Sequence, residues 1–432
     1  MFYVILISVI TYIGMIFFTK HRTSISFIGS GLLLMLGSIT GIFDSAEAFL
    51  EFPGEIVILI IVLSLFTEIF KKLGIIDYIG YRFITLSKGN KSMIVLTIPI
   101  LMYVTSLFMN NLTVVLLFTY MTLYLAIEYR LPIVPILVSV VIGSNIGGAP
   151  LPWADTPAVV LTLYSDFTLI DFLNKLFLPC LIYVILLSAY TYIWYRYFTP
   201  RKRFLPFREK PNVDWKEVKI PLIIFVIYII SVSIGPFINI SIAYISLLFG
   251  GIALLIDKNN PMDTLNNLPI MDSIAFIIAL FLIGGVLEYS GVLANIADSV
   301  MSLTNKDSIL IVLAILLLAF IIATFLSAGP AAATLLPICA NLSYAVPFNL
   351  IYAALALGIL AGSSMLPWSA TGGPILLSQT NKFLKEVSLD DEDRKSIEKI
   401  YDLKSYLLFS IPFSLIILSL SGIYLVIFTK IM

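Results

Sequence analysis

Long apolar runs follow one another along almost the whole chain, and they limit its fold more strictly than any other feature. A helix needs about 20 apolar residues to cross the hydrocarbon of a bilayer. Of the 432 residues, 60% are hydrophobic and 12% are charged, a charged fraction about half that of soluble domains. The pattern predicts an all-α polytopic membrane protein. The runs lie near 2–19, 25–42, 56–70, 91–109, 112–127, 132–165, 174–197, 220–236, 240–256, 268–287, 307–326, 331–346, 347–378 and 405–428.

Charge and reactive residues exclude several classes of protein. The chain has 26 basic and 26 acidic residues, so no net field attracts nucleic acid. Cys180 and Cys339 lie in apolar runs and His21 is the single histidine, which leaves no Cys or His cluster for a resident metal. The sequence has no Gly-x-x-x-x-Gly-Lys loop for a nucleotide. We therefore expect no cofactor, no nucleic-acid partner and no enzymatic activity.

The distribution of Lys and Arg indicates which segments are cytoplasmic. If 91–127 and 307–346 are re-entrant hairpins, ten full crossings remain, and 23 of the 26 basic residues fall on one side. Short arms and a polar first tip favour re-entrance over two further crossings for each hairpin. This arrangement predicts a multi-pass inner-membrane protein whose termini are both external. The cytoplasmic segments would be 20–24, 71–91, 128–131, 196–219, 258–267 and 382–404.

The chain contains an internal repeat. Residues 143–156 align with 358–371 at a shift of 215, and the apolar runs recur in the same order. Each copy has five crossings and one hairpin, and because five is odd, the second copy is inverted in the membrane. The expected organisation is a first repeat at 1–197 (hairpin 91–127, broken helix 132–165), a cytoplasmic linker at 198–219, and a second repeat at 220–432 (hairpin 307–346, broken helix 347–378). The identical pairs are Gly143/Gly358, Gly147/Gly362, Leu151/Leu366, Pro152/Pro367, Trp153/Trp368 and Thr156/Thr371.

Glycine and proline interrupt both copies near mid-membrane. The stretches Gly147–Pro152 and Gly362–Pro374 cannot form ordinary lipid-facing helices, because proline lacks an amide donor and glycine loosens the backbone. Such backbone survives in a bilayer only where protein or water covers it. Inverted repeats with interrupted helices are typical of secondary transporters. A pair of kinked packing helices remains the alternative interpretation.

Asp155 is the one acidic residue that this topology places near mid-membrane. Its counterpart in the repeat is Ala370, so the two copies differ chemically. An acid inside a membrane indicates a functional site, and burial favours its protonated form, which suits proton exchange. Asp155-Thr-Pro157 also fits a helix N-cap with proline in the first turn, and that interpretation stays open.

The candidate binding residues are the hairpin tips and the helix breaks, where carbonyls attract cations and helix N-termini attract anions. The adjacent asparagines of the first tip fit either coordination or a hydrogen-bonded turn. A sodium ion would have oxygen ligands at Asn111, Asp155 and Thr156. No Lys or Arg lies deep in an expected span, so an anionic substrate would depend on helix dipoles, hydroxyls and amides. The full candidate set is Asn110, Asn111, Thr113, Asn145, Gly147, Gly148, Asp155, Thr156, Ser327, Gly329, Ser363, Ser364, Ser369 and Thr371.

Asn110–Leu116 followed by Asn145–Pro157 resembles the ion transporter superfamily, in which an Asn-rich hairpin precedes a Gly-Gly…Gly-Asp segment. The resemblance covers essentially the whole chain and is strongest to the arsenite-efflux permease, D-type sodium/proton antiporter and P-protein-like branches. Leu366–Gln379 and Gly284–Gly291 are also similar to the arsenite permease pattern. The resemblance implies an elevator or rocking transporter and a homodimer, with substrate and coupling ion held at the tips and breaks.

These observations lead to one principal functional hypothesis. We expect a secondary active transporter that moves a small inorganic ion or metalloid and is coupled to protons or sodium, as in arsenite permeases or sodium/proton antiporters. An organic-anion symporter of the citrate or dicarboxylate type is the first alternative, and a passive ion channel is an alternative of another class. The sequence leaves open the substrate, the coupling ion and the choice between symport and antiport.

Overall fold

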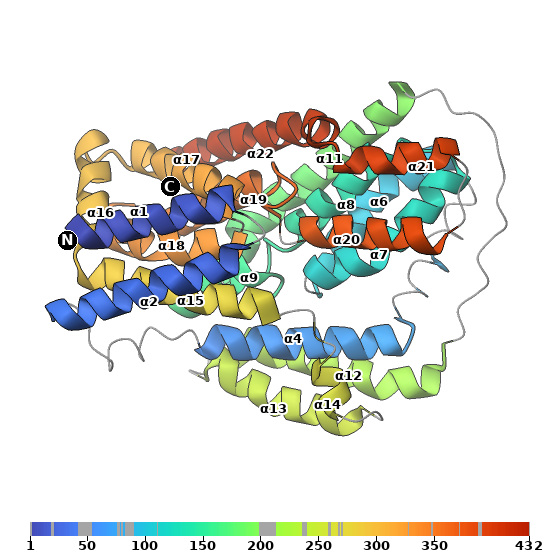
Figure 1. The fold of residues 1–432 in the computed structure, drawn as a ribbon, viewed down its shortest axis with the longest axis horizontal. Helices are drawn as coiled ribbons and strands as arrows, with labels where there is room; N and C mark the ends of the chain where they lie inside the picture. The colour runs from blue at the N-terminus through green and yellow to red at the C-terminus, as the bar shows by residue number, and fades with distance from the viewer. Residues whose placement is uncertain are drawn as a thin grey trace.

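All regular structure in the described part of the chain is helical (Figure 1), which confirms the all-α class. The computed structural model describes residues 2–18, 21–41, 54–75, 78, 81–82, 90–109, 111–197, 213–235, 240–257, 261–266, 268, 271–326, 328–346, 349–370, 372–387 and 391–431. The expected linker boundary at 198–219 stays a prediction, since residues 198–212 lie outside these ranges.

The helices of the two halves correspond in order. The first half contains α1 (Phe2–Phe17), α2 (Arg22–Thr40), α4 (Gly54–Lys72), α6 (Lys91–Ser106), α7 (Asn111–Glu128), α8 (Ile133–Gly147), α9 (Thr156–Tyr164), α10 (Leu169–Asp171), the π-helix η2 (Phe172–Phe177) and α11 (Leu178–Tyr197). The second half contains α12 (Trp215–Ile234), α13 (Ile242–Ile256), α14 (Pro261–Asn266), α15 (Met271–Tyr289), α16 (Val292–Leu303), α17 (Ser308–Leu326), α18 (Ala328–Leu342), the short η4 (Ser343–Ala345), α19 (Leu350–Ser363), α20 (Gly373–Glu386), α21 (Asp391–Glu398), the short η6 (Lys399–Tyr401) and α22 (Leu403–Ile431).

Several helices begin or end away from their expected positions. Helix α12 begins at Trp215 rather than near 220, because the Asp214 carboxylate accepts a capping bond from the Lys216 amide at 2.9 Å. Helix α20 continues to Glu386, eight residues past the expected end, because Phe383 is buried against aromatic rings of α7. The amphipathic α16 was not expected from the sequence, and it bends away from α15 by 71°.

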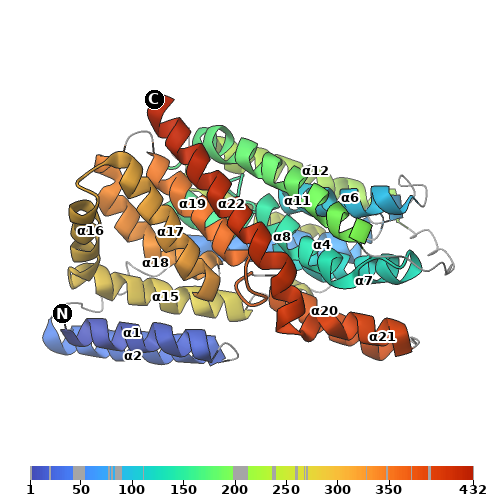
Figure 2. The same ribbon diagram turned by 90° about the horizontal axis from the view of Figure 1, so that it is seen from above.

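The two halves are intertwined rather than separate. Helix α4 of the first half packs with α12 and α13 of the second, while α15 of the second half packs with α1 and α2 of the first. Figure 1 shows α4, α12 and α13 together along the lower edge, and Figure 2 shows α1, α2 and α15 beside one another. Around the centre, α9 packs on α18 and α20 packs on α7. The second segment of each broken helix therefore contacts the hairpin of the other half. These exchanged contacts are what an inverted repeat with a pseudo-twofold axis predicts.

Helix α4 is joined to α13 near both ends. At one end Ser241 Oγ donates to Glu55 Oε1 at 2.9 Å. At the other end Lys72 Nζ lies 3.7 Å from Asp257 Oδ2. Between these polar contacts a Cβ on Gly250 would lie 2.7 Å from Val62 Cγ2, so the two helices also approach closely in the middle. This pair therefore forms a firm contact between the halves.

Paired glycines let each broken helix pack tightly against the first arm of its own hairpin. A Cβ on Gly143 would lie 3.0 Å from the carbonyl oxygen of Pro99 in α6. The repeat partner Gly358 faces the carbonyl oxygen of Leu316 in α17 in the same way. Gly147 and Gly362, one turn further on, likewise face carbonyls of α6 and α17. Small residues spaced by four are the usual means of close packing between membrane helices.

Both hairpins are present, and each tip lies at a helix break. The end of α6 and start of α7 contact the first break, and the start of α18 contacts the N-terminus of α9. Helix α17 has the length expected from the run 307–326, and it is among four described helices that could each cross a bilayer by length and composition, so the short-arm argument for re-entrance does not hold for it. These four are Thr23–Thr40, Leu169–Tyr197, Ser308–Leu326 and Leu403–Lys430.

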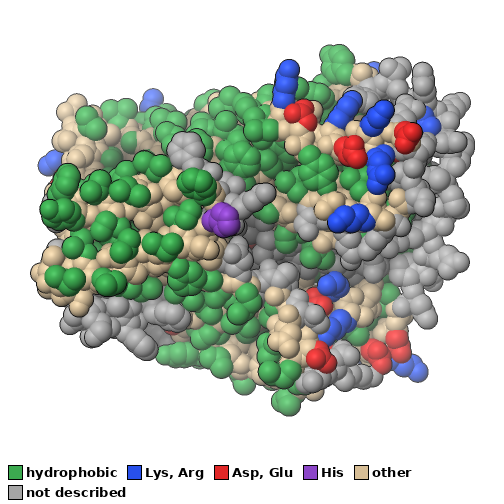
Figure 3. Space-filling model, viewed as in Figure 1, with side chains coloured by type: hydrophobic (Ala, Val, Ile, Leu, Met, Phe, Trp, Pro, Cys, Tyr) green, Lys and Arg blue, Asp and Glu red, His purple; other side chains and the backbone are tan. Residues whose placement is uncertain are grey.

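The surface separates into an apolar part and a charged end. Figure 3 shows hydrophobic side chains over most of one face, with Lys and Arg gathered toward the end that carries α20 and α21. Large hydrophobic side chains such as Tyr3, Ile39 and Leu255 are more than 60% exposed, as lipid-facing positions are. The molecule is therefore a multi-pass membrane protein, and the assignment of the charged end to the cytoplasm remains a prediction.

Candidate ion and substrate site

Asp155 ends the break between α8 and α9. Its side chain is buried, with 5% of the residue exposed, and its backbone is extended. Asp155 occupies the N-cap position of α9: its carbonyl accepts from the Val159 amide at 3.0 Å and Pro157 lies in the first turn. Its side chain makes no capping hydrogen bond, so the carboxylate is not used as the usual side-chain cap.

Asn111, the first residue of α7, holds the Asp155 carboxylate. Its Nδ2 donates to Asp155 Oδ2 at 2.8 Å and also approaches Asn145 Oδ1 at 3.4 Å. The hydroxyl of Ser106, at the end of α6, donates to Asn111 Oδ1. This network brings together the first hairpin, α8 and the start of α9, and it fixes the orientation of the Asn111 amide.

The second carboxylate oxygen of Asp155 has no hydrogen-bond partner among the described residues, although it is buried. A buried carboxylate oxygen without a donor is costly, because that oxygen has lost its hydration and has no hydrogen bond to replace it. A bound proton or a cation would remove that cost. Oδ1 of Asp155 is therefore the atom at which a proton or a cation would be most stabilised.

Gly148 allows Asn111 and Asp155 to approach each other. A Cβ on Gly148 would lie 2.8 Å from Asn111 Nδ2 and 2.8 Å from the Asp155 Cβ. Both distances are shorter than real Cβ contacts, so any larger residue would displace the pair. Gly147, by contrast, faces the backbone of Tyr103 and the side chain of Ser106, where it permits helix packing.

The second hairpin and Trp153 enclose the site from other directions. A Cβ on Gly329 would lie 2.8 Å from Thr156 Cγ2, which places the start of α18 against the start of α9. The indole Nε1 of Trp153 donates to the carbonyl of Leu107, at the first hairpin tip, at 3.2 Å. The first break is thus in contact with both hairpins.

The second break contributes backbone rather than free side chains. The hydroxyls of Ser364 and Ser369 donate to the carbonyls of Leu360 and Leu366, both at 2.8 Å. The carbonyl of Ser363 accepts from Asn145 Nδ2 at 3.2 Å, which joins the two broken helices directly. The candidate serines therefore bond to their own backbone.

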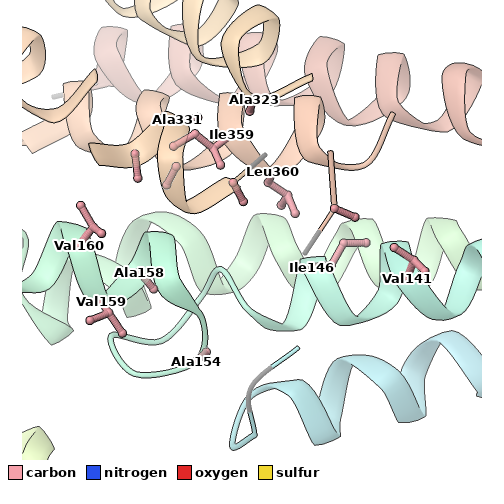
Figure 4. Close-up of a cluster of buried hydrophobic side chains, with 14 of the residues drawn as sticks. Val141, Ile146, Ala154, Ala158, Val159, Val160, Ala323, Ala331, Ile359 and Leu360 are labelled. Carbon is pink, nitrogen blue, oxygen red and sulfur yellow. The ribbon is translucent and has the colours of Figure 1, made fainter. Parts of the chain in front are cut away.

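A small, partly open cavity of about 20 Å³ lies beside Asp155. A volume of this order holds roughly one water molecule or a bare cation. The walls come from α8, α9 and the break on one side and from α18 and α19 on the other, and Figure 4 shows apolar side chains of these elements facing one another. The lining residues are Asn145, Gly148, Ala149, Asp155, Pro157, Ala158, Leu161, Ala328, Ala356, Ile359, Leu360 and Ser363.

Asp155 is the only charged side chain in this lining, and no Lys or Arg is part of it. Helices α9 and α20 both begin at the breaks, and the N-terminus of each carries a partial positive charge. In the described residues there is no group of three or more His, Cys, Asp and Glu side chains that would hold a metal ion. A hard cation bound at Asp155 would therefore take its other ligands from amide and carbonyl oxygens.

The structure brings together Asn111, Asn145, Gly148, Asp155 and Thr156 from the candidate set. Asn110, Ser327 and Thr371 lie outside the described residues, as does the side chain of Thr113. Sequence reasoning missed Ser106, which orients Asn111, and the apolar wall of α19. Ser106 lies five residues before Asn111 in the hairpin, so its position near the tip was a usable signal.

The fold and this site define a class: polytopic membrane transporters built from inverted repeats with broken helices. Residues 12–362 match the model of the family described as CitMHS, citrate transporter, and the chain belongs to this family. The family is part of the ion transporter superfamily, so the resemblance seen in the motifs is confirmed.

Individual relatives agree with this assignment. A 46 kDa membrane protein of Mycobacterium leprae is 23% identical over 390 residues, covering 87% of this chain and 90% of that protein. The P protein of Sus scrofa is 30% identical over 151 residues, or 35% of this chain and 18% of that protein. The crystal structure of the Alcanivorax borkumensis YdaH transporter has a TM-score of 0.59 at 12% identity, covering 94% of this chain and 98% of that one, and it shows the fold alone.

Proposed function

We propose that this chain is a secondary transporter in which Asp155 binds and releases the coupling proton or sodium ion. The observation that carries the proposal is the buried Asp155 Oδ1, which has no donor among the described residues and lines the cavity. Binding of a proton or a cation there neutralises the only charge in the lining. The occupied site can then change its exposure to the two sides without moving a bare carboxylate through an apolar layer.

For the substrate we propose an organic anion of the citrate type. The family description supports this choice, and it moves the sequence-based alternative ahead of the inorganic ion. The N-termini of α9 and α20 supply partial positive charge for carboxylates at the breaks. A cation at Asp155 would first remove the repulsion that a free carboxylate exerts on an anion. Coupling and substrate binding would then depend on each other for an electrostatic reason.

A small inorganic ion or metalloid is the second candidate. The observation that favours it is the absence of Lys and Arg from the cavity lining, which suits an uncharged or cationic solute better than a multiply charged anion. A passive channel is a third hypothesis, and a demonstration of uphill transport would exclude it.

The experiment uses full-length protein reconstituted in proteoliposomes, with radiolabelled citrate and, separately, arsenite as probes. An imposed proton or sodium gradient should drive one of these solutes uphill. Asp155→Asn should reduce gradient-driven transport about tenfold or more, since a charge-assisted contact is worth ~1.5–3 kcal/mol. Asp166→Asn is the matched control, because Asp166 is exposed just beyond the end of α9. Full gradient-driven transport by a well-expressed Asp155→Asn protein would contradict the proposal.

A further inference from the structure

The backbone carbonyls of the second break are occupied by hydroxyls from the same chain. Ser369 Oγ lies 2.8 Å from the carbonyl oxygen of Leu366, 3.0 Å from that of Ser363 and 3.3 Å from that of Gly362. The Leu366 amide in turn donates to Ser369 Oγ at 3.0 Å. Ser369 is fully buried, so this hydroxyl fills the space where the carbonyls converge.

A hydroxyl has one proton, so Ser369 donates to one of these carbonyls at a time or shares its proton between them, and each of the three also accepts from an amide. The amide of Met365 donates to Gly362 O at 3.1 Å, and that of Ser369 donates to Leu366 O at 3.1 Å. Ser363 O accepts from Asn145 Nδ2 at 3.2 Å. A carbonyl oxygen has two lone pairs. Asn145 and Ser369 together can therefore use both lone pairs of Ser363 O.

Helix α22 donates to two further carbonyls at and just before the same break. Ser414 Oγ donates to Ala361 O at 2.6 Å, and Ser410 Oγ donates to Met365 O at 2.7 Å. Both serines are fully buried. A cation at this break would have to displace several short hydrogen bonds and would meet no carboxylate, since the counterpart of Asp155 is Ala370.

The first break lacks these hydroxyls. At the repeat shift of 215 residues, Ala149 stands opposite Ser364 and Ala154 stands opposite Ser369. The polar side chain of the first break is instead Asp155, whose Oδ1 is buried and without a partner in the described part of the chain. The two breaks have thus diverged: the first retains an anionic oxygen without a partner in the described residues, and in the second, serine hydroxyls donate to backbone carbonyls.

We infer that each chain binds one coupling cation, at Asp155, and that Ser369 and Asn145 permanently close the equivalent position in the second half. This inference rests on the proposed coupling role of Asp155 and adds the number of ions and the role of Ser369. Ser369 is a positioning residue, because it bonds to backbone and does not line the cavity. Asn145 connects the closed break to the Asn111–Asp155 pair.

The test measures cation binding to the purified full-length protein by tryptophan fluorescence. Trp153, two residues from Asp155 and bonded to the first hairpin tip, is the reporter in a chain whose other three tryptophans, Trp194, Trp215 and Trp368, are replaced by phenylalanine. Sodium chloride replaces choline chloride at pH 8.5 in one titration. A sodium-free pH titration uses a His21→Gln background, because His21 is the single histidine and is exposed. We expect a transition with a Hill coefficient of about 1 that is lost in Asp155→Asn.

Substitutions at Ser369 test whether its hydroxyl only bonds to backbone carbonyls or also coordinates the cation. Ser369→Ala should leave the midpoint of the cation transition within about twofold of wild type while lowering the melting temperature. Ser369→Thr keeps the hydroxyl and serves if the alanine protein does not fold. A shift of the midpoint by more than about tenfold in either variant would make Ser369 a ligand and overturn the inference.

The other outcomes distinguish the inference from the function on which it rests. A Hill coefficient above about 1.5 that vanishes in Asp155→Asn overturns the single-ion stoichiometry and leaves the coupling role of Asp155 intact. A transition that survives Asp155→Asn with the same midpoint and amplitude overturns both, whereas a smaller residual transition with another midpoint reveals a second site and overturns only the single-ion stoichiometry. Both are also overturned if the fluorescence of the wild-type protein changes with neither sodium nor protons.

Discussion

A Cβ on Gly148 would lie 2.8 Å from the Cβ of Asp155, so the site exists only because residue 148 has no side chain. The backbone of Gly148 has φ −76° and ψ −10°, which any residue can adopt. The glycine is therefore required by the space between α8, α7 and the break, and not by a special backbone conformation. This makes residue 148 a sensitive probe of the Asn111–Asp155 contact.

Gly148→Ala should disable coupling while leaving the fold largely intact. The added methyl group would displace Asn111 Nδ2, which it would meet at 2.8 Å, together with Asp155. We expect gradient-driven uptake per reconstituted protein to fall about tenfold, equivalent to ~1.4 kcal/mol. Gly251→Ala is the control, because nothing lies within 4 Å of a Cβ at that position. Normal gradient-driven uptake by Gly148→Ala would show that coupling does not require the Asp155 carboxylate to keep its present contact with Asn111.

Gly362→Ala should lower stability rather than change ion binding. A Cβ at Gly362 would collide with the carbonyl oxygen of Phe320 in α17, and a backbone atom cannot move aside as a side chain can. Overpacking of this kind costs about 1–3 kcal/mol. The measurement is thermal unfolding of the detergent-purified protein, and Gly251→Ala should be neutral or slightly stabilising by comparison. An unchanged melting temperature would mean that α17 and α19 are further apart than described.

A disulfide should form between the second hairpin and the first broken helix. A Cβ at Gly329 would lie 3.3 Å from the Cβ of Thr156, close to the 3.5–4.5 Å range of disulfides. Gly329→Cys with Thr156→Cys, in a chain with Cys180→Ala and Cys339→Ala, should cross-link on oxidation and lose transport until reduced. Mass spectrometry of digested protein detects the linked peptides, and the two single-cysteine chains are controls. Failure to cross-link under strong oxidation would place the tip away from the break.

Labelling of introduced cysteines tests the orientation in the membrane. In a chain without Cys180 and Cys339, Lys306→Cys should react with an impermeant maleimide added outside intact cells. Lys210→Cys should react only after permeabilisation, because the positive-inside rule places that segment in the cytoplasm. Residue 210 lies outside the described ranges, so this experiment is the direct measure of its side. The opposite labelling pattern would invert the topology.

The sequence alone determined the class of fold, because length and apolarity of the runs decide whether a segment can remain in a bilayer. It also located both breaks: Gly148 to Asp155 and Ser364 to Gly372 separate the half-helices as glycine and proline predicted. The paired glycines were visible as repeat identities, and the same physics of close helix packing explains them. Asp155 was identified because a lone carboxylate within an apolar run is costly wherever it packs.

Only the tertiary structure decided which polar groups are free. Asn111 lies 34 residues before Asn145 and 44 residues before Asp155 in the chain. The crossing of α7, α8 and α9 places the Asn111 side chain in hydrogen-bond contact with both. Ser369 looked like a binding residue in the sequence, and its buried hydroxyl bonds to carbonyls of its own break. The type of a side chain determines which hydrogen bonds it can make. Packing determines which of those bonds are already made within the protein and which groups remain free to bind an ion. The distinction between an open first break and a closed second one therefore belongs to the three-dimensional structure.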